Sequence, residues 1–284
     1  MTAYFRPATL DEALAIRAAR PVEIVAGGTD VYPNRATRAG WGRLRHPDVL
    51  DITAIPGLDR IEERPDHWRI GCLVTWTALA RAELPPLFGG LKAAATAIGG
   101  AQIQNRGTLV GNLCTASPAG DGIPNLMALD AQVEIARPGG MRLVDIEAFF
   151  TGYRATVCAP DEIVVAVRVP KRDARGRFEK LGARRYLVIS IVMVAAAIEV
   201  QAGRIAHARL CVGACSPVAR RLRGLEARLV GEPLFAAADL VRPEDFSALT
   251  PLDDVRASAA YRLAAAQALV RDCLAGLAET RRAA

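Results

Sequence analysis

The sequence predicts an α+β protein in two parts, and three observations support this prediction. Its 284 residues are enough for about two domains. Short apolar runs alternate with helical periodicities in the N-terminal part, whereas the C-terminal part has three long β-prone runs followed by helices. A charged turn with proline and glycine, 170–176, separates the two parts. We therefore expect one domain at 1–171 and a second at 175–284.

The N-terminal part is expected to open with a helix and a strand that ends in a glycine turn. Thr9 and Glu12 form a capping-box pattern ahead of apolar residues at helical spacing, which predicts a helix that opens at Thr9. A β-prone run at 22–26 stops at the turn 27–30, whose sequence is Gly-Gly-Thr-Asp. Short strands are expected next at 49–52, 58–61 and 68–72, and helices at 75–83 and 87–97.

A segment rich in glycine, hydroxyl and amide side chains follows at 98–121. Four of its glycines precede Asn112, and glycine lets the backbone approach a ligand closely or adopt a positive φ. Its polar side chains with donors and acceptors are Asn112, Thr115, Ser117 and Asp121. We expect a ligand loop rather than a simple packed element. The expected ligand is a large, hydroxyl-rich cofactor that carries phosphate.

The remaining elements lie on both sides of the charged turn. Before it, we expect a helix at 123–129 and strands at 131–136, 142–144 and 162–169. After it, we expect strands at 178–185, 186–200 and 204–212 and helices at 218–230 and 253–278. The three C-terminal strands follow one another through short turns. This pattern predicts a three-stranded antiparallel sheet that packs against the helices.

Composition argues against several classes of function. The formal net charge is +6, but the basic residues are spread along the chain and match no nucleic-acid-binding motif, so we expect no nucleic acid partner. This charge suits a solvated surface or an acidic partner subunit. The six cysteines lack CxxC spacing, so we expect reduced thiols and no bound metal. No apolar run reaches the roughly 18–20 residues of a membrane span and no secretory signal is visible, so we expect a cytoplasmic protein without a membrane span.

Two loops of small residues are candidates for binding an anion. The chain has neither a GxxxxGK[ST] nor a GxGxxG motif, so it resembles neither P-loop nucleotidases nor Rossmann dinucleotide binders. The loops 26–30 and 108–112 can still present backbone N–H groups to a diphosphate without any lysine. Either loop alone is also compatible with an ordinary glycine turn.

Taken together, the loops resemble those of the flavin-binding medium subunits of the molybdenum hydroxylases, a family that includes carbon monoxide dehydrogenase and bacterial xanthine dehydrogenases. Residues 26–30 match the family's AGGTD loop. Residues 102–121 match QIRNxGTxGGNLxxASPxxD, with Gln104 in place of arginine and Val110 in place of glycine. Further matches at 124–131 (PxLLALDA), 162–170 (EIIxxIRxP) and 180–185 (KxxxRR) extend the resemblance over nearly the whole chain.

The resemblance implies a fold, a cofactor and a set of binding residues. The first domain would have the PCMH-type, vanillyl-alcohol-oxidase-like architecture, in which two α+β subdomains hold FAD, and the second would carry the three-stranded antiparallel sheet. The two loops would wrap the diphosphate, Asp121 would accept hydrogen bonds from cofactor hydroxyls, and Lys180 would lie near the isoalloxazine ring. The implied FAD-binding residues are Ile24, Val25, Ala26, Gly27, Gly28, Thr29, Asp30, Val31, Ile98, Thr108, Val110, Gly111, Asn112, Ser117, Asp121, Ile163 and Lys180.

Other interpretations are open for four of these residues. Asp121 could cap the helix expected at 123–129. Lys180 could be a solvated lysine on a strand. Ile98 and Ile163 could be ordinary core residues.

The resemblance also implies electron transfer, with no catalytic residue toward substrate in this chain. FAD would accept electrons from the [2Fe-2S] clusters of a small subunit, after a molybdopterin-binding large subunit has oxidised the substrate, and would pass them to an external acceptor. That acceptor would be NAD, a quinone, a cytochrome or oxygen, and the assembly would be a dimer of heterotrimers. Two alternatives are a stand-alone FAD-dependent oxidase of the same fold and a non-catalytic scaffold that has lost its flavin.

Overall fold

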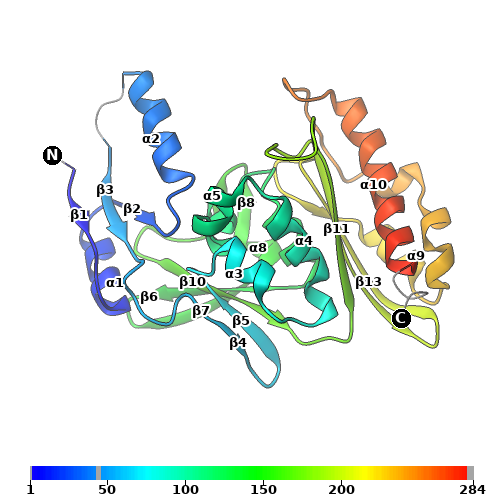
Figure 1. Cartoon of the computed structure of the whole chain (residues 1–284), viewed down its shortest axis with the longest axis horizontal. Coiled ribbons are helices and arrows are strands. Elements are labelled where there is room, and N and C mark those ends of the chain that lie inside the picture. Colours follow the sequence, from blue (N-terminus) through cyan, green and yellow to red (C-terminus); the bar gives the residue numbers. More distant parts are fainter. Residues whose placement is uncertain (1, 43–45, 280–284) are drawn as a thin grey trace.

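A computed structural model describes residues 2–42 and 46–279 of the chain. Figure 1 shows three layers of structure along the longest axis: a small N-terminal lobe at one end, a central sheet with helices, and a C-terminal sheet flanked by the last long helix. The overall class is α+β, as the sequence predicts. None of the helices within the described residues is long and apolar enough to cross a membrane.

The N-terminal lobe is a parallel three-stranded sheet in the order β1-β3-β2. Half of the predicted capping box is present, because Thr9 Oγ1 accepts from the Glu12 N–H at 3.2 Å, whereas the Glu12 carboxylate accepts from the Ala8 N–H at 2.9 Å and not from that of Thr9. This lobe comprises β1 (Tyr4–Phe5), α1 (Leu10–Ala19), β2 (Val22–Val25), α2 (Val31–Gly40) and β3 (Asp48–Asp51).

Helix α2 was not expected from the sequence. It begins directly after the glycine turn and contains Pro33 as its third residue. Proline is tolerated there, because the first-turn N–H groups of a helix have no carbonyl partner within the helix. None of its residues is buried, so it lacks the apolar stripe that marks a packed helix in a sequence.

The central sheet has five antiparallel strands in the order β4-β5-β10-β6-β7. Its middle strand is β10, which is nearly continuous in apolar residues and is buried on both faces. The predicted strand at 58–61 is wrong, because only Ile61 enters a strand and the preceding residues form turns. The strands are β4 (Ile61–Glu63), β5 (His67–Gly71), β6 (Gln132–Arg137), β7 (Gly140–Asp145) and β10 (Ile163–Pro170), and a separate hairpin is formed by β8 (Phe150–Gly152) and β9 (Ala155–Thr156).

Short helices connect the strands of the central part. The glycine-rich segment 98–121, which we expected to be a ligand loop rather than a simple packed element, contains two of these helices. The second one forms because Thr108 Oγ1 accepts from the Gly111 N–H at 3.0 Å and because Leu109 and Leu113 are fully buried. The helices are α3 (Trp76–Arg81), η1 (Pro86–Phe88), α4 (Gly89–Ala97), α5 (Ala101–Arg106), α6 (Leu109–Thr115), α7 (Gly122–Ala128) and α8 (Ile146–Phe149).

The C-terminal sheet contains the three long antiparallel strands that the sequence predicts, together with a fourth strand of two residues. The predicted strand at 186–191 is wrong. Leu187 has a φ of +53°, which a strand cannot accommodate, and the Tyr186 side chain is exposed. Helices α9 and α10 begin later than predicted. The elements are β11 (Arg175–Leu181), β12 (Val192–Gln201), β13 (Arg204–Gly213), β14 (Arg220–Arg221), α9 (Arg223–Leu229), η2 (Leu234–Leu240), η3 (Pro243–Phe246) and α10 (Ala259–Glu279).

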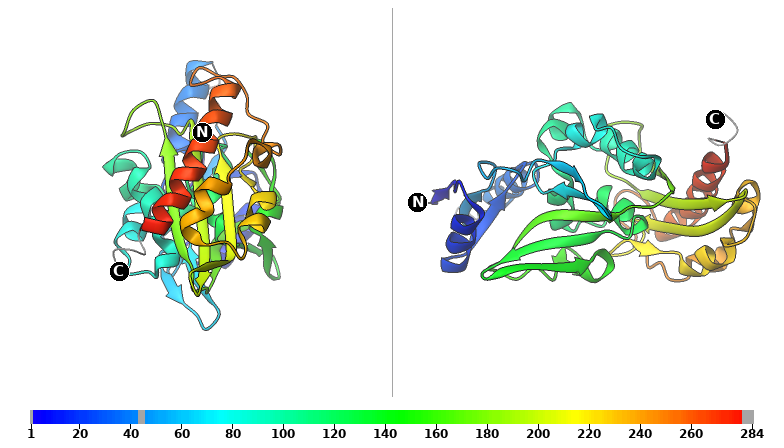
Figure 2. Two further views of the ribbon diagram at one scale, coloured as in Figure 1. Left: turned by 90° about the vertical axis from the view of Figure 1, so that its right-hand side faces the viewer. Right: turned by 90° about the horizontal axis from the view of Figure 1, so that it is seen from below.

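The C-terminal sheet lies between two sets of helices, α4 and α7 on one face and α9 and α10 on the other. Figure 1 shows α4 and α10 on opposite sides of this sheet, and the left view of Figure 2 shows α10 in front of its strands. Alternate residues of β12 belong to different hydrophobic cores. Met193 and Ala195 join the core of the N-terminal and central parts, whereas Val194 and Ala196 join the core beneath α10. This alternation follows from the two-residue period of a strand.

Candidate functional site

The candidate site is a cavity of about 510 Å³ where the N-terminal lobe, the central helices and the loop before β12 meet. Both predicted loops line it, although they are far apart in the sequence. Of the predicted binding residues, these line the cavity: Ile24, Ala26, Gly27, Gly28, Thr29, Asp30, Val31, Ile98, Thr108, Val110, Gly111, Asn112, Ser117 and Ile163. Val25, Asp121 and Lys180 lie outside the lining.

Gly27 of the first loop is in direct backbone contact with Arg106 and Gly107, the two residues directly before the second loop. A Cβ atom on Gly27 would lie 1.9 Å from the carbonyl oxygen of Arg106 and 2.9 Å from the Cα of Gly107. No side chain fits in that space. Gly28 has a φ of +73° and the Tyr32 ring lies over it, so the turn requires glycine at this position for a second reason.

Two helices begin at the cavity wall. Asp30 and Val31 form the start of α2, and Thr108 forms the start of α6. The first N–H groups of a helix have no partner within the helix, and the helix dipole makes this end attractive to anions. The Asp30 side chain does not cap α2 and instead accepts a hydrogen bond from Asn34 Nδ2 at 2.8 Å. In α2 the Tyr32 N–H donates to the Gly28 carbonyl and Pro33 has no N–H. In α6 the Leu109 N–H donates to the Val74 carbonyl and the Gly111 N–H to Thr108 Oγ1, so the donors left for a ligand at the two helix starts are the N–H groups of Val31 and Val110.

Asn112 ties the second loop to the helix that follows it. Its Oδ1 accepts from the Gly122 N–H at 3.1 Å, which links α6 to α7. Thr115 Oγ1 donates to the Gly111 carbonyl at 3.0 Å, and Ser117 Oγ accepts from the Ala119 N–H at 3.3 Å. The polar side chains of this segment thus hold the cavity wall in place as well as facing it.

Asp121 and Lys180 form a buried ion pair beside the cavity. Lys180 Nζ lies 2.6 Å from Asp121 Oδ2, and the two side chains are 11% and 3% exposed. Ser190 donates to the other oxygen of Asp121, also at 2.6 Å. Asp121 makes no capping bond to α7, and Lys180 is not solvated, so neither of the two alternative interpretations describes these side chains. Asp121 thus joins the central part to both ends of the loop between β11 and β12, through Lys180 at one end and Ser190 at the other.

Several residues of the cavity wall carried no recognisable signal in the sequence. Trp76 is fully buried, and Cys72 and Ile189 lie in segments that the sequence analysis assigned to strands. Burial raises the pKa of the Cys72 thiol to about 12, so this thiol is protonated at neutral pH. Arg154, at the tip of the β8–β9 hairpin, brings the one cationic side chain that the described lining contains.

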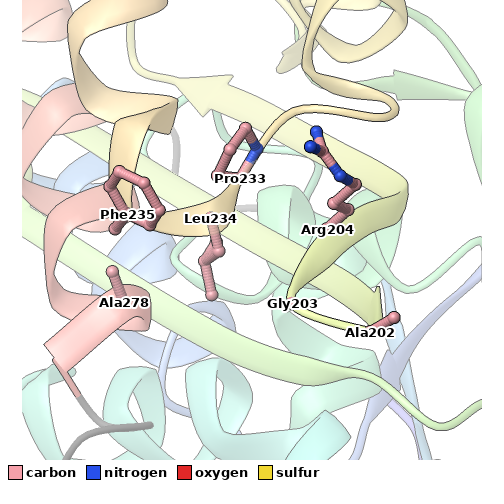
Figure 3. Close-up of a pocket in the computed structure, with 7 residues that line it drawn as sticks. All are labelled: Ala202, Gly203, Arg204, Pro233, Leu234, Phe235 and Ala278. Atoms are coloured by element: carbon pink, nitrogen blue, oxygen red, sulfur yellow. The ribbon is translucent and has the colours of Figure 1, made fainter.

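A second cavity, of about 390 Å³, lies in the C-terminal part, beside the turn between β12 and β13 (Figure 3). Its one charged side chain is Arg204, whose guanidinium already donates to the Gly231 carbonyl at 2.8 Å. None of the predicted loops reaches it, and it combines no group of polar side chains, so the first cavity is the better candidate. Its lining residues are Ala202, Gly203, Arg204, Pro233, Leu234, Phe235 and Ala278.

Two family models match the chain in succession. The first, described as the FAD binding domain in molybdopterin dehydrogenase, matches residues 1–172. The chain belongs to this family. The second, described as the CO dehydrogenase flavoprotein C-terminal domain, matches residues 178–277. Both candidate loops of this flavoprotein fall within the first match.

Curated relatives and solved structures agree with this assignment. The nicotine 6-hydroxylase medium subunit of Paenarthrobacter nicotinovorans is 31% identical over 94% of both chains, and the putative xanthine dehydrogenase FAD-binding subunit of Escherichia coli is 30% identical over 94% of this chain and 93% of the relative. The structure of quinoline 2-oxidoreductase from Pseudomonas putida 86 superposes with a TM-score of 0.88 at 26% identity, covering 99% of this chain and 98% of that one. The CO dehydrogenase structure from Hydrogenophaga pseudoflava gives 0.85 at 26% identity, covering 96% of both.

The two departures from the family pattern have simple structural accounts. Gln104 Nε2 donates to the carbonyls of Thr96 and Ile98, each at 3.1 Å, so it holds the C-terminal end of α4. Val110 lies within α6 and does not have a positive φ, so its backbone conformation does not require glycine.

The cavity fits the FAD of this family. Glycine backbone and two helix starts suit a diphosphate, and the apolar side chains Ile98, Ile103 and Ile189 offer a surface for a flat ring system. The flavoprotein is therefore an FAD-carrying subunit of an oxidoreductase.

Proposed function

We propose that this chain is the medium subunit of a molybdenum-containing hydroxylase or dehydrogenase. In this proposal a large subunit holds molybdopterin and a small subunit holds [2Fe-2S] clusters, and two such heterotrimers associate. The domains divide as 1–171 and 175–284. The observation that supports the proposal most is the two-loop cavity, in which Gly27 brings two distant segments into backbone contact.

When bound, FAD supplies a group that takes up single electrons and releases two as a hydride. The chain's own residues bind and orient it. Residues 26–31 and 108–112 would hold the diphosphate, and Ile98 and Ile189 would exclude water from the apolar part of the cavity. Electrons arrive from the small subunit and leave to an external acceptor: NAD, a quinone, a cytochrome or oxygen.

Asp121 and Lys180 have a structural part in this proposal. Their ion pair and the Ser190 hydrogen bond fix the loop that carries Ile189 against the central part. Since the pair borders the cavity, we propose that it keeps the ring end of the site closed. Direct hydrogen bonds from Asp121 or Lys180 to the cofactor stay a prediction.

The test is to purify the chain together with its partner subunits and to analyse the cofactor released by acid. We expect a flavin visible spectrum, FAD and not FMN in the extract, and a copurifying molybdenum chain and cysteine-rich iron–sulfur chain. A complex without flavin would contradict the proposal. Flavin in an isolated chain that oxidises a substrate without partners would favour a stand-alone oxidase instead.

A further inference from the structure

Arg154 is held at the mouth of the cavity by a rigid hairpin. The residues Tyr153 and Arg154 form the two-residue turn between β8 and β9, since Gly152 pairs with Ala155. Phe149, at the base of the hairpin, is fully buried, and its carbonyl accepts from the Val157 N–H at 2.9 Å. The base of the hairpin is thus anchored in the core, and its tip places Arg154 in the cavity lining.

The backbone of Arg154 adopts a conformation that arginine rarely takes. Its φ is +50°, in the left-handed region where glycine and asparagine predominate. Such strained non-glycine residues concentrate at ligand-binding sites, because the surrounding structure maintains the strain for a purpose. A glycine would relax this turn but would remove the side chain. The turn therefore carries an arginine side chain at a position that a glycine would occupy with less strain.

The charge of Arg154 is only weakly satisfied within the protein. Its Nη1 lies 3.9 Å from Asp30 Oδ2, and the two side chains are 43% and 48% exposed. An ion pair at this distance and exposure contributes little. Asp30 and Arg154 are also the only charged side chains of the cavity lining within the described ranges. A doubly charged anion that entered the cavity would meet one available cation.

Guanidinium and diphosphate match in charge and geometry. The planar fork of arginine donates two parallel hydrogen bonds to phosphate oxygens, which lysine cannot do. Arg154 is beside Asp30, at the start of α2, where the Val31 N–H and the helix dipole favour an anion. The guanidinium at the hairpin tip would add a side-chain donor next to this helix start.

We propose that Arg154 binds the diphosphate of a dinucleotide in this cavity, and that this dinucleotide is FAD. The assignment rests on the proposed function, because it presumes that FAD occupies the cavity. It adds a side-chain contact from the β8–β9 hairpin to the two backbone loops.

The test compares ligands with and without the diphosphate on the apoprotein. In flavin fluorescence titrations, Arg154→Ala should raise the Kd for FAD about tenfold or more, because a hydrogen bond to a charged group is lost. Riboflavin has no phosphate, so its Kd should stay within twofold of the value for the parent protein. Arg154→Gly should lose FAD affinity equally while relaxing the turn, and Arg154→Lys should be intermediate. Arg64→Ala is the matched control, because Arg64 is 51% exposed and also pairs with an acid, Glu62.

Each other outcome overturns the assignment in a distinct way. Equal loss of FAD and riboflavin affinity, or a lowered thermal midpoint in Arg154→Gly, would show that the residue acts through folding. Unchanged FAD affinity, together with weaker NAD⁺ binding to the FAD-loaded protein by equilibrium dialysis, would move the diphosphate to an external dinucleotide. A parent protein that binds no FAD would reject the proposed function and not this residue's role alone.

Discussion

Replacing Gly27 with alanine tests the two-loop cavity most directly. The added Cβ would lie 1.9 Å from the Arg106 carbonyl oxygen and 2.7 Å from the carbonyl carbon. Both atoms are backbone, so no side chain can rotate away. The loops must separate by about 1.5 Å to restore the 3.4 Å of an ordinary contact.

This separation should affect both stability and binding. Overpacking of a tightly packed site costs about 1–3 kcal/mol, so the free energy of unfolding of the apoprotein should fall by about that amount in a urea titration. A ligand held by both loops loses alignment with one of them. Displacements near 1 Å are enough to weaken binding and catalysis strongly, and we expect the Kd for FAD to rise by at least about tenfold.

Gly40→Ala is the matched control. Gly40 lies at the end of α2, a Cβ there would have open space around it, and its φ is not positive. This variant should bind FAD like the parent and should unfold with the same or slightly higher free energy. Parent-like FAD affinity in Gly27→Ala would refute the reasoning, because it would mean that the cofactor does not depend on contact between the loops.

Three further predictions concern stability. Asp121→Ala leaves the Lys180 ammonium buried without its partner, so the free energy of unfolding should fall by about 3–5 kcal/mol in urea titrations. Adding Lys180→Met should recover part of this loss. A double variant that is no more stable than Asp121→Ala would contradict the prediction. Thr108→Ala removes the acceptor for the Gly111 N–H and should cost about 1 kcal/mol by thermal unfolding, whereas Thr108→Ser should stay near the parent. The hydrogen bonds from Arg142 hold the pKa of Glu162 below its ordinary value of 4.5. The ion pair therefore contributes its full stability above pH 4.5, and this contribution is lost as the pH falls through the lower pKa of the folded state. Glu162→Gln should therefore flatten the dependence of the unfolding free energy on pH below 4.5, and an unchanged slope would exclude this pair as its source.

Hydrophobic periodicity located most elements, but it failed where apolar residues are not buried. The run 186–189 is rich in β-prone residues and was expected to form a strand. In the structure Leu187 is left-handed and exposed, and its side chain lies over Gly100 in the central part. The reverse error occurred at α2, a helix without buried residues that opens with a glycine turn and Pro33. At 186–189 the contact of Leu187 with the central part accompanies the loss of the strand, and at α2 the helix has no buried apolar stripe that a sequence pattern could reveal.

The candidate site was predictable to the extent that its residues are neighbours in the sequence. The two glycine loops can be recognised in the sequence because each concentrates small and polar residues in one segment. The pairing of Asp121 with Lys180 joins positions 59 residues apart, and nothing local marks it. Arg154 was equally hidden, because its positive φ and its place at the cavity mouth are properties of the folded hairpin.

Because the side chains of β12 alternate between its two faces, the C-terminal sheet packs against a hydrophobic core on each side. Met193 and Ala195 complete the packing of the central part, while Val194 and Ala196 complete that of the helices beyond. Cutting the chain at 170–176 and removing the C-terminal part would take this sheet away from α4 and α7 and leave them with an exposed apolar surface. The two matched regions are therefore consecutive in the sequence but share a hydrophobic core. We expect the region 1–172 to unfold cooperatively only together with the C-terminal sheet.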